Sequence, residues 1–542
     1  MTNIVPQEID IEAAELIAGV TYTAAERAQM GEGLAFQMAR AQRRRAFGMP
    51  LDVHPASVFD PRLPGFVMPR EQGVKVLPSA RPLPAGDVDI AYASVVELSG
   101  WIKSGALTSE RLTRIYLERI ERLGPTLECI ALATPERALA EARAADAKLA
   151  RDEWLGPLHG IPYGCKDLLD TAHLATRWGA EPYMDRMPDA DSEVVRKLSA
   201  AGAVLVAKTS LGALAYGDIW HSGQTRNPWN LEEGSSGSSA GSGSGTAAGL
   251  FAFSIGTETL GSIVSPSTRC GLAGLRPTFG RVSRAGAMAL CWSLDNVGPM
   301  CRFVDDTALV LDVLNGFDVA DPGSIAAPFA YDGTAGIAGL KVGYFEADMG
   351  EALDRASLEA AQALGVTVVP LVRADLPYET LIDVLYAEAA AAFEDLTLSG
   401  RDDLLTWQEP MAWPTAFRRA RFLSAVDHVQ LDRLRRLVMR EVDRWFGEVD
   451  VILGGPLTGP MGTITNFTGQ PCLAVRSGFR QTPTRITRGL GVPLGLADGP
   501  AHRVPHSVWL WGRLFEEAPI LRLGRALEQH FGVAGERPPG FA

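Results

Sequence analysis

Residues 234–262 read GSSGSSAGSGSGTAAGLFAFSIGTETLGS, and the interpretation of this stretch decides the fold. Its first part, 234–245, holds 5 Gly and 6 Ser in 12 positions, which is typical of a flexible linker. The following residues run from a helix-like piece through an apolar strand into a second small-residue turn at 256–262. Because a linker rarely lies between two core elements, a buried role for the Gly/Ser segment competes with the linker interpretation.

Apolar or β-branched runs alternate with helical patterns around this stretch. We expect strands at 129–133, 161–165, 203–207 and 507–512. We expect helices at 109–123, 134–150 and 517–531. The first two helices begin with Ser or Thr and an acidic first turn, as good caps require. The alternation predicts an α/β fold.

Two segments depart from this alternation. Residues 1–88 combine helical apolar spacing with a Pro-rich irregular stretch, so we expect an N-terminal arm packed on the main body. Residues 376–446 are rich in Ala, Leu and aromatics, which favours a helical insertion over the central sheet. The expected organisation is therefore an arm, 1–88, and one large domain, 89–542, that carries this insertion.

Composition excludes several classes of protein. The net charge of −13, with no basic block beyond Arg43–Arg45, argues against nucleic acid as a partner. The 6 Cys residues form no C-x-x-C pair, so neither a zinc site nor a disulfide scaffold is indicated. The N-terminus is acidic and the most apolar window, 246–264, contains Glu258, which argues against a signal peptide and a membrane span. We expect a cytoplasmic protein without a membrane partner.

Two familiar motifs fit the Gly/Ser segment. Gly243, Gly245 and Ala248 match the dinucleotide fingerprint G-x-G-x-x-A. Ser239 matches the nucleophile position of G-x-S-x-G, with a later Asp and a histidine as partners. The candidate histidines are His428, His502, His506 and His530. Both motifs need a strand directly before the loop, whereas the preceding NPWNLEEGSS is polar and contains Pro.

A third interpretation uses lysine as the base. The chain has only 7 Lys, and two of them follow apolar runs: Lys166 in HGIPYGCKDLLD and Lys208 in AVLVAKTS. Either could be a strand-end residue whose amine reaches solvent. A lysine base must be neutral part of the time, so it needs burial or suitable neighbours to lower its pKa. Arginine cannot serve in this way.

Three motifs in order resemble the amidase signature family over about residues 90–535. They are GIPYGCKDLLDT with Lys166, GSSAGS at 237–242, and GTETLGSI at 256–263 followed by GLAGLRPTFGRVS. The resemblance implies a central mixed, twisted β-sheet flanked by helices on both faces, with the helical insertion near the active site. It also implies hydrolysis of carboxylic amide, ester or carbamate bonds in small molecules, without a metal or organic cofactor, and often a homodimer.

The resemblance assigns a Ser–cis-Ser–Lys triad. Ser262 is the implied nucleophile, Lys166 the base, and Ser238, 24 residues before Ser262, the serine that bridges them. The implied oxyanion hole consists of the backbone N–H groups of Thr259, Leu260, Gly261 and Ser262. The expected supporting residues are Ser239, Thr257 and Glu258, and the expected substrate contacts are Tyr216 and Gly237.

The chain departs from the family pattern at two positions: it has Leu260 where the family has glycine, and Val264 where the family has arginine. A positive φ at position 260 is therefore in question. The aromatics of the insertion and Trp292 fit an apolar acyl or aryl pocket, or an ordinary core. Two other functions stay open: a glutamine-hydrolysing A-type subunit of a tRNA-dependent amidotransferase, and a non-catalytic amidase-fold binding protein.

Overall fold

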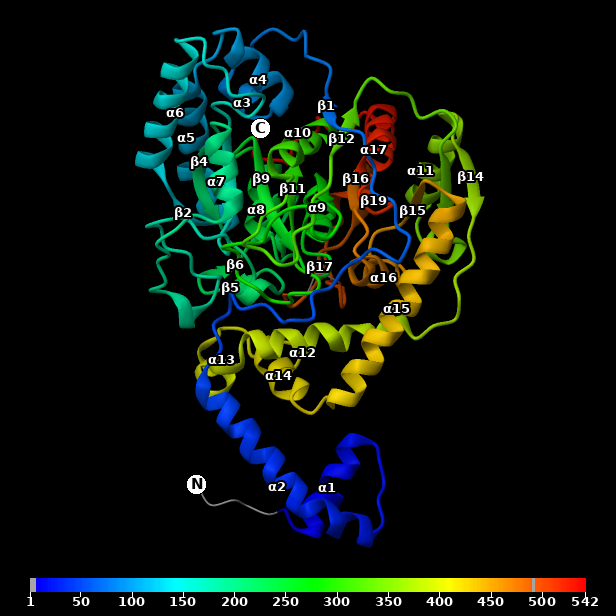
Figure 1. Ribbon diagram of the computed structural model, residues 1–542. Coiled ribbons are helices and arrows are strands. Elements are labelled where there is room, and N and C mark those ends of the chain that lie inside the picture. Colours follow the sequence, from blue (N-terminus) through cyan, green and yellow to red (C-terminus); the bar gives the residue numbers. More distant parts are fainter. Residues whose placement is uncertain (1–5, 490–492) are drawn as a thin grey trace.

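The computed structural model describes residues 6–489 and 493–542. Within these residues an 11-stranded mixed sheet forms the centre (Figure 1), in the order β14-β13-β15-β19-β16-β10-β11-β9-β3-β4-β2. The strands, in that order, are Thr367–Pro370, Lys341–Tyr344, Val451–Gly454, His502–Gly512, Cys472–Thr482, Ala273–Arg276, Asn296–Cys301, Phe253–Glu258, Pro162–Lys166, Val204–Thr209 and Ile130–Ala133.

The sheet contains both parallel and antiparallel pairs. Strand β3 pairs in parallel with β4 and β9, and β13 pairs in parallel with β14 and β15. The other neighbours are antiparallel. The four strands expected from the sequence are β2, β3, β4 and the end of β19. The predicted α/β fold with a mixed central sheet is confirmed.

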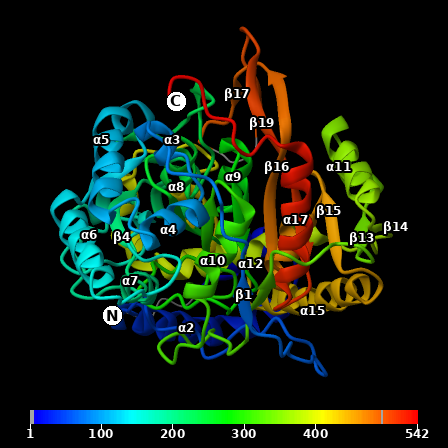
Figure 2. The same cartoon turned by 90° about the horizontal axis from the view of Figure 1, so that it is seen from above.

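Helices flank the sheet and cover its two ends. Figure 2 shows α5 and α6 beside the β4 end, and α11 beside the β14 end. The expected helices are α5 (Ser109–Leu127), α6 (Pro135–Leu149) and α17 (Glu517–Phe531). The others around the sheet are α3 (Asp87–Ala91), α4 (Val95–Lys103), α7 (Glu193–Ala200), α9 (Val264–Cys270), α10 (Val304–Leu314), α11 (Ala352–Ala363) and α16 (Met461–Thr468). None of the helices that the structure describes combines the length and apolarity needed to cross a membrane.

The Gly/Ser segment forms a buried helix, α8 (Ala240–Ala247), in which every residue is buried. Its glycines permit close packing. A Cβ atom on Gly241 would lie 2.2 Å from the Cys129 carbonyl oxygen, and one on Gly245 would lie 2.4 Å from the Phe251 ring. The low side-chain volume therefore lets a helix pack directly against core elements, and the linker interpretation is wrong.

The insertion is helical, as expected for residues 376–446. It comprises α12 (Ile382–Ala392), α13 (Glu394–Leu398), α14 (Trp413–Ala420) and α15 (Ala425–Glu448), which lie mostly below the sheet in the view of Figure 1. Its aromatic residues form a core: Trp413 stacks on Phe417 with ring centroids 4.9 Å apart, and Trp407 is buried nearby. These three side chains act as packing groups.

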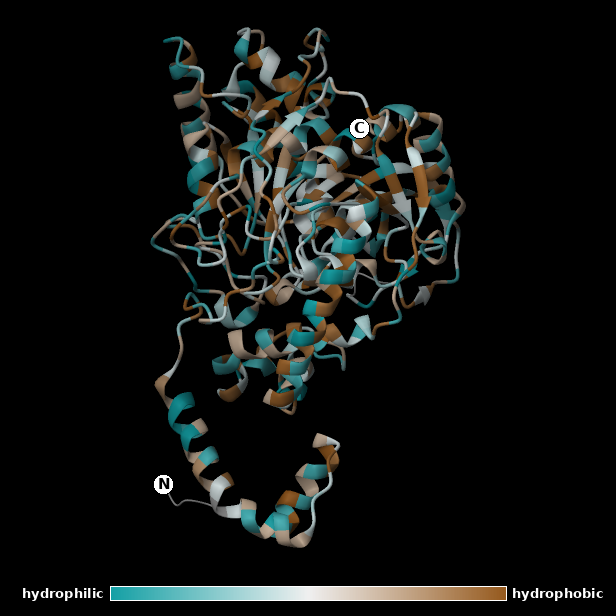
Figure 3. Ribbon diagram, turned by 45° about the vertical axis from the view of Figure 1, so that its right-hand side comes forward, coloured by the Kyte–Doolittle hydropathy of each residue, from teal (hydrophilic) through white to brown (hydrophobic). Residues whose placement is uncertain are grey.

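Residues 6–75 divide into two parts. Helices α1 (Glu8–Ala18) and α2 (Ala24–Phe47) lie apart from the sheet (Figures 1 and 3), and Arg44 pairs with Glu394 of the insertion. The following stretch returns to the body, where β1 (Gly73–Lys75) pairs with β12 (Ala330–Asp332). Several apolar side chains on α1 and α2 are exposed, including Ile9, Leu16, Phe36 and Phe47. The expected homodimer stays a prediction.

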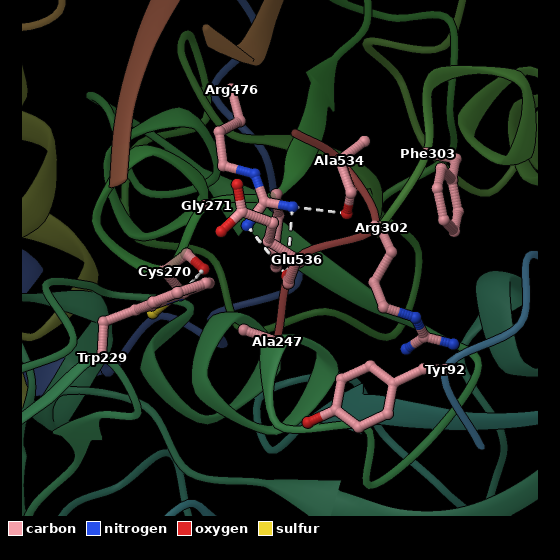
Figure 4. Close-up of a pocket in the computed structure, with 12 residues that line it drawn as sticks. Tyr92, Trp229, Ala247, Cys270, Gly271, Arg302, Phe303, Arg476, Ala534 and Glu536 are labelled. Atoms are coloured by element: carbon pink, nitrogen blue, oxygen red, sulfur yellow. Dashed lines mark hydrogen bonds between the residues drawn. The ribbon is translucent and has the colours of Figure 1, made fainter. Parts of the chain in front are cut away.

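The C-terminal segment lies against the end of α9. Arg476 donates hydrogen bonds to the carbonyl oxygens of Ala534 and Glu536 (Figure 4), and Arg119 donates to that of Phe541 at 2.6 Å. The cavity among the residues of Figure 4 measures about 10 Å³, which is room for about one water. It is too small to hold a substrate.

Candidate active site

A buried lysine lies at the centre of the candidate site. Lys166 is the last residue of β3 and is fully buried. Its Nζ lies 2.8 Å from Ser238 Oγ and 3.0 Å from Ser239 Oγ. The same atom lies 2.8 Å from Thr257 Oγ1 and 3.2 Å from the Thr257 carbonyl oxygen. Residues from two segments, both more than 70 positions after Lys166, therefore converge on its amine.

The surroundings of Lys166 disfavour its charged form. Burial lowers the pKa of Lys166 well below its usual range, although Asp295 and Glu258 partly oppose this effect. The four oxygens within hydrogen-bond distance belong to hydroxyl and carbonyl groups, which carry no charge. These surroundings therefore favour the neutral amine over the charged one.

The turn before α8 presents Ser238 to this amine. The peptide bond between Gly237 and Ser238 is cis, and Ser236 has a φ of 63°. A Cβ atom on Gly237 would lie 1.7 Å from the Gly217 carbonyl oxygen, so this position requires glycine. The Asp218 carboxyl accepts a hydrogen bond from the Ser236 N–H at 3.0 Å, and burial raises the pKa of Asp218 to about 6. Asp218 carried no signal in the sequence.

Glu258 holds the chain directly after Ser262. Its Oε2 accepts hydrogen bonds from the Ile263 N–H at 2.8 Å and the Val264 N–H at 3.0 Å. Its Oε1 accepts one from Arg276 Nη1 at 2.6 Å. Arg276 lies in the GLAGLRPTFGRVS motif, but the sequence predicted no role for it.

Residues 259–262, here called the Ser262 turn, connect β9 to α9. The left-handed residue of this turn is Gly261, with a φ of 82°. Leu260 does not have a positive φ, so the missing glycine at this position does not force an L residue into that region. Its partly buried side chain packs against the core. The Ser262 carbonyl accepts a hydrogen bond from the Ser239 N–H at 3.2 Å. This bond joins the Ser262 turn to the turn before α8, which carries Ser238.

Asp295 supports the Ser262 turn at its first residue, Thr259. Its Oδ1 accepts a hydrogen bond from Thr259 Oγ1 at 2.6 Å, and its Oδ2 accepts from the N–H groups of Leu290 and Cys291. Burial raises the pKa of Asp295. Sequence reasoning missed this residue because its contact with Thr259 spans 36 positions and follows no short motif.

The competing catalytic interpretations are not supported by the geometry. Lys208 lies 3.4 Å from Asp167 and donates to the Leu169 carbonyl at 2.8 Å, as a packed ion-pair residue. His506 pairs with Asp354 at 2.9 Å.

The G-x-S-x-G and dinucleotide motifs also lack the strand of the central sheet that both need directly before the loop. The strand before the loop, β8 (Asn230–Gly234), belongs to a separate two-stranded sheet with β7 (Arg226–Asn227). The fingerprint residues Gly243 and Gly245 lie inside α8.

A cavity of about 260 Å³, here called the inner cavity, lies beside the Ser262 turn. Thr257, Thr259 and Asp295 line it on the catalytic side. Its apolar wall consists of Leu168, Ala287, Met288, Leu290, Trp292 and Val297. Tyr216, an expected substrate contact, packs between Trp407 and Trp413, whereas its neighbour Ala215 lines the cavity.

The Glu258–Arg276 pair yields a stability prediction. Arg276→Met is expected to destabilise the protein by about 3–5 kcal/mol, because it leaves the buried Glu258 carboxylate without its charge partner. Urea unfolding followed by fluorescence measures the loss. Arg276→Met combined with Glu258→Gln should recover part of it, since the unpaired charge is gone. A loss below about 1 kcal/mol in the single variant would contradict this role.

A mixed sheet that brings a buried lysine against a serine preceded by a cis peptide bond, next to a second serine-bearing turn, is the arrangement of the amidase signature enzymes. The chain belongs to this family: the family model described as Amidase matches residues 111–477.

Relatives and solved structures agree with this assignment. "Putative amidase AmiD" of Mycobacterium tuberculosis is 33% identical over 476 residues, covering 83% of this chain and 96% of that protein. The A-type subunit of the glutamyl-tRNA(Gln) amidotransferase of Geobacter metallireducens is 33% identical over 473 residues, covering 80% and 96%. The native peptide amidase from Stenotrophomonas maltophilia superposes with a TM-score of 0.70 at 27% identity, covering 84% and 99%.

Proposed function

We propose that the protein is an amidohydrolase that cleaves carboxylic amide bonds in small molecules through an acyl-enzyme on Ser262. Esters and carbamates are further candidate substrates. The observation that carries the proposal is the buried amine of Lys166, 2.8 Å from Ser238 Oγ and surrounded by uncharged oxygens. A neutral amine in this position can accept a proton, which an exposed lysine at neutral pH cannot.

In the proposed acylation step Lys166 accepts the proton of Ser238 Oγ, and Ser238 accepts that of Ser262 Oγ. The Ser262 oxygen forms a bond to the substrate carbonyl carbon. The backbone N–H groups of residues 259–262 stabilise the negative charge that develops on the carbonyl oxygen. Ser238 then gives its proton to the nitrogen as the C–N bond breaks, because an amine leaves only when protonated, and it recovers a proton from Lys166, which becomes neutral again.

Deacylation repeats the relay with water in place of Ser262. Water gives its proton through Ser238 to Lys166 and attacks the acyl carbon, and Ser262 Oγ recovers a proton as it leaves. Every group in this scheme belongs to the chain, so the scheme requires no metal or organic cofactor. The apolar wall of the inner cavity favours an acyl or aryl group on the substrate.

Trapping of the intermediate tests the proposal. A panel of anilides, esters and carbamates is mixed with the enzyme, quenched in acid and examined by intact mass and peptide mapping. We expect a burst of product and an acyl group on Ser262. Turnover with the acyl group on another residue, such as Ser239, would overturn this assignment.

A second candidate is glutamine hydrolysis as one component of a larger enzyme. It is favoured by the 33% identity to the A-type subunit of the glutamyl-tRNA(Gln) amidotransferase. Glutaminase activity that appears only after partner subunits are added, with no hydrolysis of the panel by the chain alone, would support this candidate. Hydrolysis of anilides by the isolated chain supports the first.

A further inference from the structure

We propose that residues 51–60 of the N-terminal arm form a specificity element that extends the substrate site into a second chamber, here called the outer cavity. The chamber would receive the distal, uncharged part of an elongated amide. This inference rests on the proposed function, because it takes the Ser262 turn as the place of bond cleavage.

The arm supplies part of the wall of the inner cavity. Leu51, Asp52 and His54 line the same space as Thr257 and Thr259, although the arm is separated from these threonines by about 200 residues of chain. At about 260 Å³ the inner cavity falls below the range of roughly 300–1,000 Å³ that is usual for small-molecule sites. It suffices for one ring or a short chain but not for a larger substrate.

The outer cavity measures about 460 Å³ and shares two lining residues, His54 and Trp292, with the inner one. Its walls come from arm residues up to Asp60 and from helices α12 and α15 of the insertion. The two spaces therefore meet where the arm passes over Trp292. In the proposal, a substrate longer than the inner cavity continues past these two side chains into the outer one.

Several contacts hold the arm against the insertion beside the outer cavity. The Arg435 guanidinium lies 3.4 Å from the centroid of the Phe59 ring, and it donates to the Ser293 carbonyl oxygen at 2.8 Å. Glu388 accepts a hydrogen bond from the Ser293 N–H at 3.0 Å. Because these contacts tie arm, insertion and the loop beside Trp292 together, the cavity is formed before any ligand binds.

The charged residues of the lining carry both signs, and two of them, Asp432 and Arg436, lie about one turn apart on α15, so the lining has no strong preference for a charged guest. Arg435 and Glu388 are both engaged with Ser293, and Asp60 is engaged with Arg62 at 2.7 Å. Apolar surface comes from Val58, Val384, Val429 and Met439. The guest predicted from these walls is an aromatic or aliphatic group.

Two polar atoms beside these apolar walls lack partners. Within residues 6–489 and 493–542, Trp292 Nε1 and His428 Nδ1 are buried and have no hydrogen-bond partner. A buried donor without a partner is costly, so an acceptor on the ligand opposite the Trp292 N–H would be favourable. The chemistry of the site thus matches an elongated neutral amide with one distal acceptor.

The experiment compares two neighbouring valines of α15. Val429 lines the outer cavity, whereas Val426, one turn earlier, does not, and both side chains are largely exposed. Val429→Trp should therefore fill the chamber without disturbing the fold, and Val426→Trp is the matched control. Each variant is assayed with short and long anilides, one series lengthened on the acyl side and the other on the amine side.

We expect Val429→Trp to lower kcat/KM for the long member of one series by about tenfold or more, with short substrates changed less than about twofold. Val426→Trp should leave both within about twofold. The series that responds identifies which end of the substrate enters the chamber. An equal effect of Val429→Trp on short and long substrates, or none on either, overturns the inference.

A failure of the proposed function gives a different result from a failure of this inference. In that case wild-type protein forms no acyl adduct on Ser262 with any member of either series. Calorimetric titration of the long amides into the two tryptophan variants then still measures occupancy of the outer cavity. At least about tenfold weaker binding to Val429→Trp than to Val426→Trp supports the chamber, and equal binding overturns it.

Discussion

Ser262→Ala is expected to lower kcat/KM for amide hydrolysis by about 10³-fold or more and to abolish the covalent acyl adduct. The alanine leaves the turn intact, since Gly261 keeps its left-handed conformation and Glu258 still accepts from Ile263 and Val264. Only the hydroxyl of Ser262, the proposed nucleophile, is removed, and loss of a nucleophile has effects of this size or larger in serine hydrolases.

The measurement combines steady-state rates with intact-mass detection of the adduct. Ser267→Ala is a matched control, because Ser267 is buried in α9 close to Ser262 in sequence and has no role in the proposed chemistry. We expect the control to retain at least about half of the activity. Residual turnover above about a tenth of wild type in Ser262→Ala would mean that another residue is the nucleophile.

Lys166→Ala is expected to reduce kcat/KM by about 10²–10⁴-fold at neutral pH and by less at alkaline pH. Burial lowers the pKa of Lys166, so the wild-type amine is neutral above that pKa and kcat/KM falls as the pH drops through it. The alanine variant lacks this titrating group, and hydroxide partly replaces the missing base at high pH. The deficit should therefore grow as the pH rises to the pKa of Lys166 and shrink again at alkaline pH.

Complete pH profiles of both proteins test this expectation. Lys208→Met is the control, because Lys208 is an equally buried lysine on the adjacent strand β4 whose amine contacts Asp167 and Thr176. This variant is expected to lose stability but to keep the shape of the wild-type profile. A ratio of wild type to Lys166→Ala that stays constant with pH would argue against Lys166 as the base.

The elements predicted from the sequence are those whose signals are local. Strands β3 and β4 and helix α5 lie within a few residues of their expected positions, because apolar runs and a Thr108 cap specify them directly. The family resemblance named Lys166 and Ser238, and the structure brings these two side chains together. The role of Ser262 as nucleophile stays a prediction.

Other parts of the site could not be predicted from the sequence. Asp218, Asp295 and Arg276 hold the two serine turns through contacts between residues 18 to 36 positions apart, which no periodicity records. The participation of His54 in the cavity depends on how the arm folds back over Trp292. The Gly/Ser segment was ambiguous for the same reason, since only its surroundings distinguish a buried helix from a linker.

By itself the sequence determined the alternation of strands and helices, the family and the residue types available for chemistry, because these follow from local patterns and ordered motifs. Only the packed structure shows which lysine is buried among serines, where the positive φ of the Ser262 turn falls, and that residues 51–54 of the arm line the inner cavity. The physical reason is that burial and contact across many residues set the pKa of an amine and the shape of a cavity, and both arise only when the chain is packed.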